Sequence, residues 1–285
     1  MNKYRMPFIP FVGLNSHRKT TVFGCAILSN ETEETYAWLL QTFLKAMCQQ
    51  KPKAVITDAD ATMISAVDGV LTGVYHRICT FHVEKNMEMH LPNKSLNEFR
   101  TLLYYTTSEQ VFEQRWHAFV RKWTSPKTTI WLKRMYTKKR LWAATYLSEG
   151  FWLGMKSNQR SESLNSSLHL HLDGEINLVD MVSHYDNAIA RFREKEAKDD
   201  CTALQIFLVP VTDFKELEVA AAIVFTPAMF YILQGDILKI GGMQILERKL
   251  GSNSYIFVVA WKNNLDSKFY VEYTPNSSET ARAQS

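Results

Sequence analysis

The sequence has 285 residues, a formal net charge of +4, 46% hydrophobic residues and 22% charged residues, which is the composition of an ordinary globular protein. Its 12% of aromatic residues argue against disorder over most of the length, and no apolar run approaches the roughly 18 residues of a membrane span. The mildly basic charge allows an acidic partner such as DNA but does not require one.

The four cysteines are scattered along the chain and form neither a C-x-x-C pair nor a zinc-ribbon spacing. Residues 1–20 show no secretory signal. We therefore expect reduced thiols, as in the cytosol or the nucleus.

The first fifty residues predict a β-hairpin followed by a helix. Residues 8–14 and 20–28 are rich in β-branched and aromatic residues, and the polar residues 15–19 between them form a turn. Asn30 and Thr32 can each cap the next segment, in which apolar residues repeat at the helical spacing.

Strands and helices then alternate. Residues 53–57 are typical of a short buried strand that runs directly into Asp58. Residues 61–71 repeat as a helix, residues 74–79 form another strand, and a helix begins near Phe81. This order predicts an α/β architecture in which the later strands are parallel.

The middle of the chain predicts helices rich in aromatic residues. From residue 95 to 147, phenylalanine and tryptophan recur at helical spacing. A short helix over residues 160–172 and a longer one over 177–196 follow. Residues 194–200 are strongly charged and indicate a solvated helix end, so we place a domain boundary near residues 200–210.

The last part of the chain predicts an α+β segment. Residues 214–238 have a helical pattern, and Pro227 is suited to the first turn of a second helix. The strand candidates are residues 239–246, 255–261 and 269–273.

Asp58 is the first candidate for chemistry. A carboxylate at the carboxyl end of a buried strand points into the crevice where α/β folds place their sites. Two or three carboxylates in such a crevice bind Mg²⁺, and paired metal ions promote phosphodiester chemistry. The alternative is that Asp58 caps the helix beginning near Asp60, although Asp60 is the stronger capping candidate.

Glu162 is the second candidate. It opens the predicted helix over residues 160–172, two residues before the apolar position Leu164. Two residues correspond to about 200° of helical rotation, which places Glu162 on the opposite, polar face. The alternative is that this face is simply exposed to solvent.

Cys79 and His82 form a C-x-x-H pair where a predicted strand meets a helix. Two such ligands could be half of a zinc site, but no second pair has a matching spacing. The alternative is that a thiol and an imidazole simply pack beside the acidic crevice.

Residues 127–142 mix six cations with aromatic side chains. Cations neutralise phosphates and aromatic rings stack on bases, so this stretch is a candidate DNA-binding surface. The alternative is a basic helix face that covers a core stripe. The candidate DNA-binding residues are Lys133, Arg134, Lys138, Lys139 and Arg140.

Taken together, these segments resemble the transposase-derived domain of Mutator-like elements (MULE), in particular its plant relatives, the far-red-impaired-response family of transcription regulators. The resemblance covers roughly residues 2–200 and depends on the order of its motifs. The matching stretches are residues 2–15, 22–28, 33–39, 54–58, 76–82 and 160–165.

The resemblance implies an α/β fold with a ribonuclease H-like core over residues 1–200. An α-helical insertion at about residues 92–158 would interrupt this core. A C-terminal α+β segment over residues 201–285 would lead toward the family's SWIM zinc finger.

The resemblance also assigns site residues. Asp58 matches the second acidic residue of the family and Glu162 the third, so both would bind Mg²⁺ in a catalytic relative. Cys79 and His82 match the C-x-x-H motif of the family.

Several parts of the family pattern fall outside this sequence. The first catalytic aspartate of the family lies on a strand just upstream of an N-K-Y motif, and here that motif is residues 2–4. The first strand, the amino-terminal zinc-binding domain and the SWIM finger are likewise not matched. We therefore expect a central piece of a longer protein or a truncated gene model.

The first hypothesis is a nuclear, transposase-derived transcription regulator without strand-transfer activity. Its expected partners are DNA and other family members, in homo- or heterodimers, with neither a membrane nor a small-molecule substrate. Zinc would belong only to the flanking domains.

The second hypothesis is a Mutator-like transposase, or its remnant, which cleaves and transfers DNA strands with Mg²⁺. The third is an inactive α/β fragment that cannot fold stably alone, because a missing strand exposes the edge of its neighbour.

Overall fold

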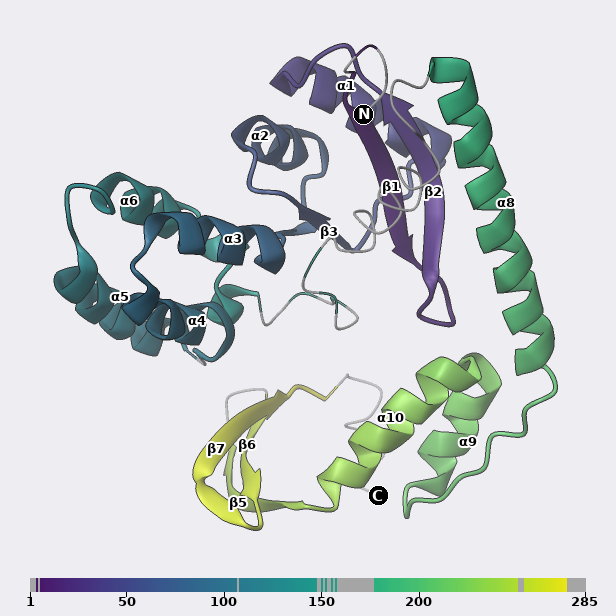
Figure 1. Cartoon of the computed structure of the whole chain (residues 1–285). Helices are drawn as coiled ribbons and strands as arrows, with labels where there is room; N and C mark the ends of the chain where they lie inside the picture. The colour runs from purple at the N-terminus through teal and green to yellow at the C-terminus, as the bar shows by residue number, and fades with distance from the viewer. Residues whose placement is uncertain are drawn as a thin grey trace. The chain divides into compact units, whose positions relative to one another are not determined.

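The computed structural model describes residues 4, 6–106, 108–147, 150, 152, 155, 157, 177–250 and 254–275 (Figure 1). The chain divides into two compact units. The first contains the residues up to Gly13 and Thr21–Arg191, and the second contains Leu14–Thr20 and the residues from Phe192 onward. The second unit therefore includes the tip of the N-terminal hairpin.

The hairpin forms as predicted, with β1 (Phe8–Leu14) paired to β2 (Thr20–Ile27). In the turn, the Asn15 side chain accepts hydrogen bonds from the backbone N–H groups of His17 and Lys19, at 3.0 and 2.9 Å. An asparagine that satisfies two turn N–H groups explains why the chain reverses here.

The helix α1 (Glu33–Ala46) begins at Thr32, whose hydroxyl accepts a hydrogen bond from the Thr35 N–H at 3.3 Å. Asn30 supports this cap by accepting a hydrogen bond from the Thr32 N–H at 3.3 Å. Of the two predicted caps, Thr32 is therefore the N-cap. The buried face of α1 consists of Tyr36, Leu39, Leu40 and Leu44.

The predicted β-α-β unit is confirmed. The strands β3 (Ala54–Thr57) and β4 (Tyr75–Ile78) are parallel, with Ala54 opposite Tyr75, and α2 (Ala61–Val70) connects them. A crossover helix is what two parallel neighbours require. The core between α1 and α2 includes Leu39, Leu40, Leu44, Ala66, Val67 and Leu71.

Helices rich in aromatic residues follow, as the spacing predicts (Figure 1). They are α3 (Thr80–His90), α4 (Leu96–Tyr104), α5 (Glu109–Trp123) and α6 (Thr129–Thr137), with short 3₁₀ turns at Asn93–Ser95, Lys139–Leu141 and Ala144–Tyr146. They enclose a core that includes Phe99, Phe112, Trp116, Phe119, Trp131 and Trp142. Trp142 is fully buried, and its indole N–H donates to the Met135 carbonyl at 2.7 Å.

The helix α8 (Leu178–Ala203) is longer than the helix predicted over residues 177–196. The charged residues 194–200 continue the helix instead of ending it, because they can face solvent without breaking its backbone hydrogen bonds. Tyr185 is the buried residue of its first half, and its ring meets the ring of Phe8 edge-on at 5.4 Å.

The second unit contains α9 (Lys215–Val224), α10 (Pro227–Ile240) and an antiparallel sheet in the order β5–β6–β7. The strands are β5 (Met243–Leu250), β6 (Tyr255–Trp261) and β7 (Asn264–Tyr273). Pro227 begins α10 as predicted. The strand predicted over residues 239–246 begins four residues late, since Lys239 and Ile240 end α10.

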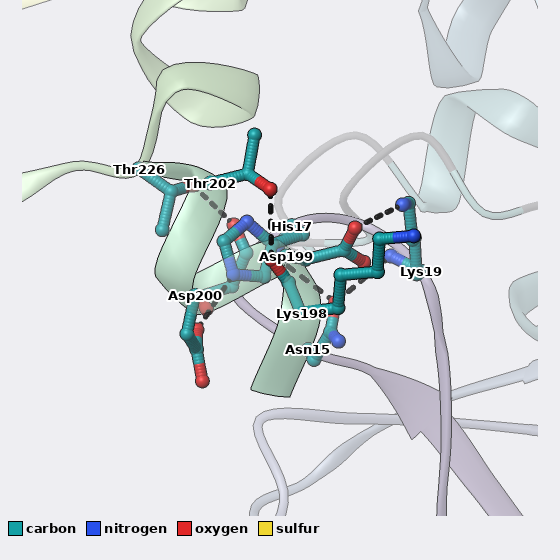
Figure 2. A network of polar contacts seen from close by, with 9 residues as sticks. Asn15, His17, Lys19, Lys198, Asp199, Asp200, Thr202 and Thr226 are labelled. Atoms are coloured by element: carbon teal, nitrogen blue, oxygen red, sulfur yellow. Dashed lines mark hydrogen bonds and ion pairs between the residues drawn. The ribbon is translucent and has the colours of Figure 1, made fainter. Parts of the chain in front are cut away.

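Polar contacts fix the hairpin tip to the end of α8 within the second unit (Figure 2). His17 lies 2.7 Å from the Asp200 carboxylate, and the Lys19 ammonium donates to Asp199 at 2.6 Å. The Thr226 hydroxyl donates to the backbone carbonyl of Ser16 at 2.5 Å. The tip is thus held by side chains that follow it by about 180 to 210 residues.

The loop before α9 is held by Glu218, which is fully buried. Its carboxylate accepts hydrogen bonds from the backbone N–H groups of Val211 and Thr212, at 3.1 and 2.9 Å, and from the Gln234 amide at 2.7 Å. A buried carboxylate is tolerated here because its oxygens are satisfied.

The fold is therefore mixed α/β, as predicted. Its described strands form a hairpin, a parallel pair and an antiparallel sheet of three. None of the helices in the described part of the chain has the length and apolar character needed to cross a membrane.

Candidate functional site

The residues 58–60, which we call the acidic turn, connect β3 to α2. Asp60 is the N-cap of α2, because its carboxylate accepts a hydrogen bond from the Met63 N–H at 2.9 Å and another from the Thr62 hydroxyl. Asp58 is exposed, and its Oδ1 accepts a hydrogen bond from the Asp60 N–H at 3.3 Å. Asp60 therefore does the capping, and Asp58 presents its carboxylate to solvent.

The pKa of Asp60 reflects this arrangement. Partial burial opposes ionisation, but the hydrogen bonds from Thr62 and Met63 and the positive charge of Lys138 outweigh it and lower the pKa of the carboxyl group. Asp60 is therefore negatively charged at neutral pH, and its carboxylate caps the N-terminus of α2.

Lys138 reaches the acidic turn from the C-cap of α6. Its ammonium donates to the Ala59 carbonyl at 3.2 Å, across a separation of 79 residues. The sequence groups Lys138 with the other cations of residues 127–142, and no local signal distinguishes it. Only the packing of α6 against the β-α-β unit brings it to Ala59.

Lys139 has a different environment from its neighbours. Its ammonium forms an ion pair with Glu113 and lies 4.0 Å from the centroid of the Tyr136 ring. Glu113 also accepts hydrogen bonds from the hydroxyls of Tyr136 and Tyr146, at 2.8 and 2.9 Å. Lys139 is thus a member of a closed network between α5 and the turn after α6.

The remaining candidate cations face solvent. Lys133 and Arg134 lie on exposed positions of α6. Arg140 is also exposed, with its guanidinium 5.7 Å from the centroid of the Tyr146 ring. Of the five predicted DNA-binding cations, these three are exposed and accessible to a phosphate.

Cys79 and His82 lie at the start of α3, beside the acidic turn. Cys79 is fully buried, and its backbone N–H donates to the Thr57 carbonyl at 2.7 Å. His82 is half-buried. Within the described ranges, no three His, Cys, Asp or Glu side chains lie close enough together to hold a metal ion.

Glu162 and the helix predicted over residues 160–172 lie outside the described residues. The assignment of Glu162 as the third acidic position therefore stays a prediction.

His76 and Arg77 are two polar residues buried on β4, and no local sequence signal marks either of them as a site residue. His76 Nε2 lies 2.9 Å from the Thr57 hydroxyl, and its Nδ1 lies 3.7 Å from the Asp68 carboxylate. Burial lowers the pKa of His76, although Asp68 acts in the opposite direction. The sequence of β4, in which exposed Tyr75 precedes three buried residues, gives no clue that the imidazole has a carboxylate nearby.

The Arg77 guanidinium stacks on the Trp152 ring and donates one hydrogen bond to the Met155 carbonyl. Its guanidinium carbon lies 5.2 Å from the centroid of the Trp152 ring, and one terminal N–H group is 3.5 Å from the Met155 carbonyl. Tyr75, two residues earlier on the same face of β4, meets Trp152 edge-on at 6.4 Å. This cluster fixes Trp152 and Met155 next to β4.

The chemistry of the acidic turn can be compared with what Mg²⁺ requires, which is several oxygen ligands in near-octahedral geometry. Among the described residues, the turn offers one carboxylate that does not cap a helix, that of Asp58. The Ala59 carbonyl already accepts a hydrogen bond from an ammonium group. The described residues therefore do not fit a divalent metal ion.

Comparison with known proteins identifies this α/β part. Residues 1–86 match the family model of the MULE transposase domain. The chain carries a MULE transposase domain. The acidic turn and the C-x-x-H pair both lie within the matched residues, which confirms the resemblance seen in the sequence.

The curated relatives of this MULE-domain chain include proteins of Arabidopsis thaliana. Protein FAR1-RELATED SEQUENCE 5 is 31% identical over 243 residues, which are 83% of this chain and 31% of the relative. Protein FAR1-RELATED SEQUENCE 12 is 26% identical over 280 residues, or 97% of this chain and 33% of the relative.

Protein FAR-RED IMPAIRED RESPONSE 1 is 27% identical over 284 residues, or 96% of this chain and 34% of the relative. The chain thus spans about a third of the length of these relatives.

Proposed function

We propose that this chain is the core of a transposase-derived transcription regulator that acts in the nucleus, binds DNA and does not transfer strands. The homologues related to FAR-RED IMPAIRED RESPONSE 1 support the family background of this proposal. The observation that carries it is the acidic turn, where Asp60 caps a helix, an ammonium group contacts Ala59, and Asp58 is left as one exposed carboxylate.

The proposal includes a ribonuclease H-like core. Its support is the order of elements in the first unit, where a hairpin and α1 precede the parallel β3–α2–β4 unit. The helices α4 to α6 fall within the proposed insertion at about residues 92–158, and their aromatic residues share one core with Ile64 of α2 and Ile78 of β4. The acidic turn lies at the carboxyl end of β3, where α/β folds place their sites.

DNA binding is assigned to the exposed cations Lys133, Arg134 and Arg140. Each phosphate contact releases counterions, so log K falls linearly with log salt with a slope of about −0.9 per contact. We expect Lys133→Met to weaken binding of random-sequence duplex DNA and to reduce that slope by about one. Fluorescence anisotropy across a salt series measures both quantities.

Lys139→Met is the matched comparison. Glu113 already neutralises the charge of Lys139. We therefore expect Lys139→Met to lower the stability of the fold and to leave the salt dependence of DNA binding unchanged. Equal effects of the two substitutions on DNA binding would contradict the assignment of the exposed cations.

The regulatory role is tested separately from DNA binding. We expect the full-length protein carrying Asp58→Asn and Glu162→Gln to activate a reporter gene as well as the unchanged protein does. Loss of activation in this doubly substituted protein, at normal abundance and with normal DNA binding, would refute the proposal. Co-purification of differently tagged copies from nuclear extracts tests the proposed homo- and heterodimers.

The second candidate function is Mg²⁺-dependent strand cleavage by a Mutator-like transposase. The exposed carboxylate of Asp58 at the end of β3 is the observation that favours it. Nicking of terminal-repeat DNA by the chain with Mg²⁺, abolished by Asp58→Asn or Glu162→Gln, would establish this activity in place of the regulator.

A further inference from the structure

Lys138 is the one described cation that contacts the backbone of the acidic turn. It is half-buried, although it belongs to a stretch whose neighbours Lys133, Arg134 and Arg140 are exposed. Its ammonium donates to the Ala59 carbonyl at 3.2 Å. As the C-cap of α6, it also lies at the negative end of the helix dipole, which favours a positive charge.

The oxygens of the acidic turn are largely engaged by groups of the chain itself. The Asp60 carboxylate accepts from Met63 and Thr62 at the start of α2. One oxygen of Asp58 accepts the Asp60 N–H, and the carbonyl between the two aspartates accepts the Lys138 ammonium. A metal ion would have to displace these donors.

We propose that Lys138 is a built-in counter-cation of the acidic turn, and that its ammonium keeps divalent metal ions off Asp58. An ammonium group takes one oxygen ligand from any incoming ion. It also repels a double positive charge at short range, where the interaction is screened only partly by water. The lysine thereby holds a fixed positive charge at the carbonyl between the two aspartates.

The structure assigns this role to the helical insertion. Lys138 follows α6, whereas the acidic turn follows β3, so the contact forms only when the insertion packs against the β-α-β unit. The inference deepens the proposed function. Exposed cations of α6 would bind DNA, while Lys138 at the end of the same helix would occupy the acidic turn.

The test measures Mn²⁺ binding to the purified chain by titration, with free Mn²⁺ counted by electron paramagnetic resonance. We expect Lys138→Met to bind Mn²⁺ at least about tenfold more tightly than the unchanged chain. Lys138→Gln, which keeps a hydrogen-bond donor without the charge, is expected to show most of the same gain. Lys138→Arg keeps the charge and is expected to show none.

Two controls locate the effect. Lys127 is exposed and precedes α6, and Lys127→Met removes the same charge elsewhere in the basic stretch. We expect it to leave Mn²⁺ binding unchanged. Adding Asp58→Asn to Lys138→Met is expected to remove the gained affinity.

The inference is overturned if Lys138→Met and Lys138→Gln bind Mn²⁺ no more tightly than the unchanged chain. It is also overturned if Lys127→Met gives the same gain, or if the gain survives Asp58→Asn. These measurements involve neither DNA nor transcription. A chain that fails to bind DNA but shows the expected metal affinities therefore contradicts the proposed function and leaves this inference standing.

Discussion

Replacing Glu113 by glutamine tests the network that pairs with Lys139 and keeps this lysine partly buried. The carboxylate accepts from Lys139 and from two tyrosine hydroxyls at 2.8 and 2.9 Å. Hydrogen bonds to a charged group are worth about 1.5–3 kcal/mol each, and glutamine retains the shape and one acceptor oxygen. Because the Glu113 side chain is 30% exposed, solvent screening reduces the loss, and we expect destabilisation of about 1–2 kcal/mol.

Urea unfolding followed by tryptophan fluorescence suits this test, since Trp116 and Trp142 lie in the core of the same helices. Partial burial raises the pKa of Glu113, but hydrogen bonds from Lys139 and the two tyrosines outweigh it and lower the pKa. A carboxyl whose pKa is lower in the folded chain stabilises above its unfolded pKa, near 4.5, and that contribution is lost as the pH falls.

The stability difference between the unchanged chain and Glu113→Gln should therefore be full at pH 7 and shrink below about pH 4.5. Glu109→Gln, in the first turn of the same helix, is the control and is expected to cost only about 0.3–1 kcal/mol. An equal loss in both variants, or a Glu113 effect that persists unchanged at pH 3, would refute the reasoning.

Three further predictions concern buried polar groups. Glu218→Gln leaves the N–H groups of Thr212 and Val211 with a weaker, neutral acceptor, and their hydrogen exchange should accelerate by about tenfold. Burial lowers the pKa of His76 in the folded chain, so on acidification the unfolded chain binds a proton at a higher pH than the folded chain does. The free energy of unfolding should therefore fall as the pH drops below about 6.5. His76→Gln should flatten this pH dependence in urea titrations. Trp152→Leu removes the ring that lies beneath the Arg77 guanidinium. We expect the free energy of unfolding to drop by about 1–2 kcal/mol, and this loss should not change between pH 6 and pH 8. A loss under ~0.3 kcal/mol would contradict a stabilising contact between Arg77 and Trp152.

Local chemistry made much of the fold predictable from the sequence. Asp60 caps α2 and Pro227 opens α10 because capping depends on groups within about four residues along the chain. The hairpin, the β-α-β unit and the aromatic helices follow from side-chain periodicity. The start of β5 was predicted four residues too early, because apolar Ile240 suits a helix end as well as a strand.

The partners of the charged residues could not be predicted in this way. Lys138 and Lys139 are neighbours in the sequence, yet one meets Ala59 and the other meets Glu113. His76 looks like any polar residue of a strand until α2 places Asp68 beside it. These contacts join segments 8 to 79 residues apart, so they depend on how helices pack and not on local preference.

The sequence by itself determined that this chain contains a MULE-like α/β core with an acidic turn at the end of a buried strand and a basic helical stretch downstream. Its ordered motifs and local periodicities are properties of neighbouring residues. The tertiary structure decided which cations remain exposed and which one contacts the acidic turn. That choice depends on the packing of α5 and α6, because a charge finds its partner only after distant segments have come together.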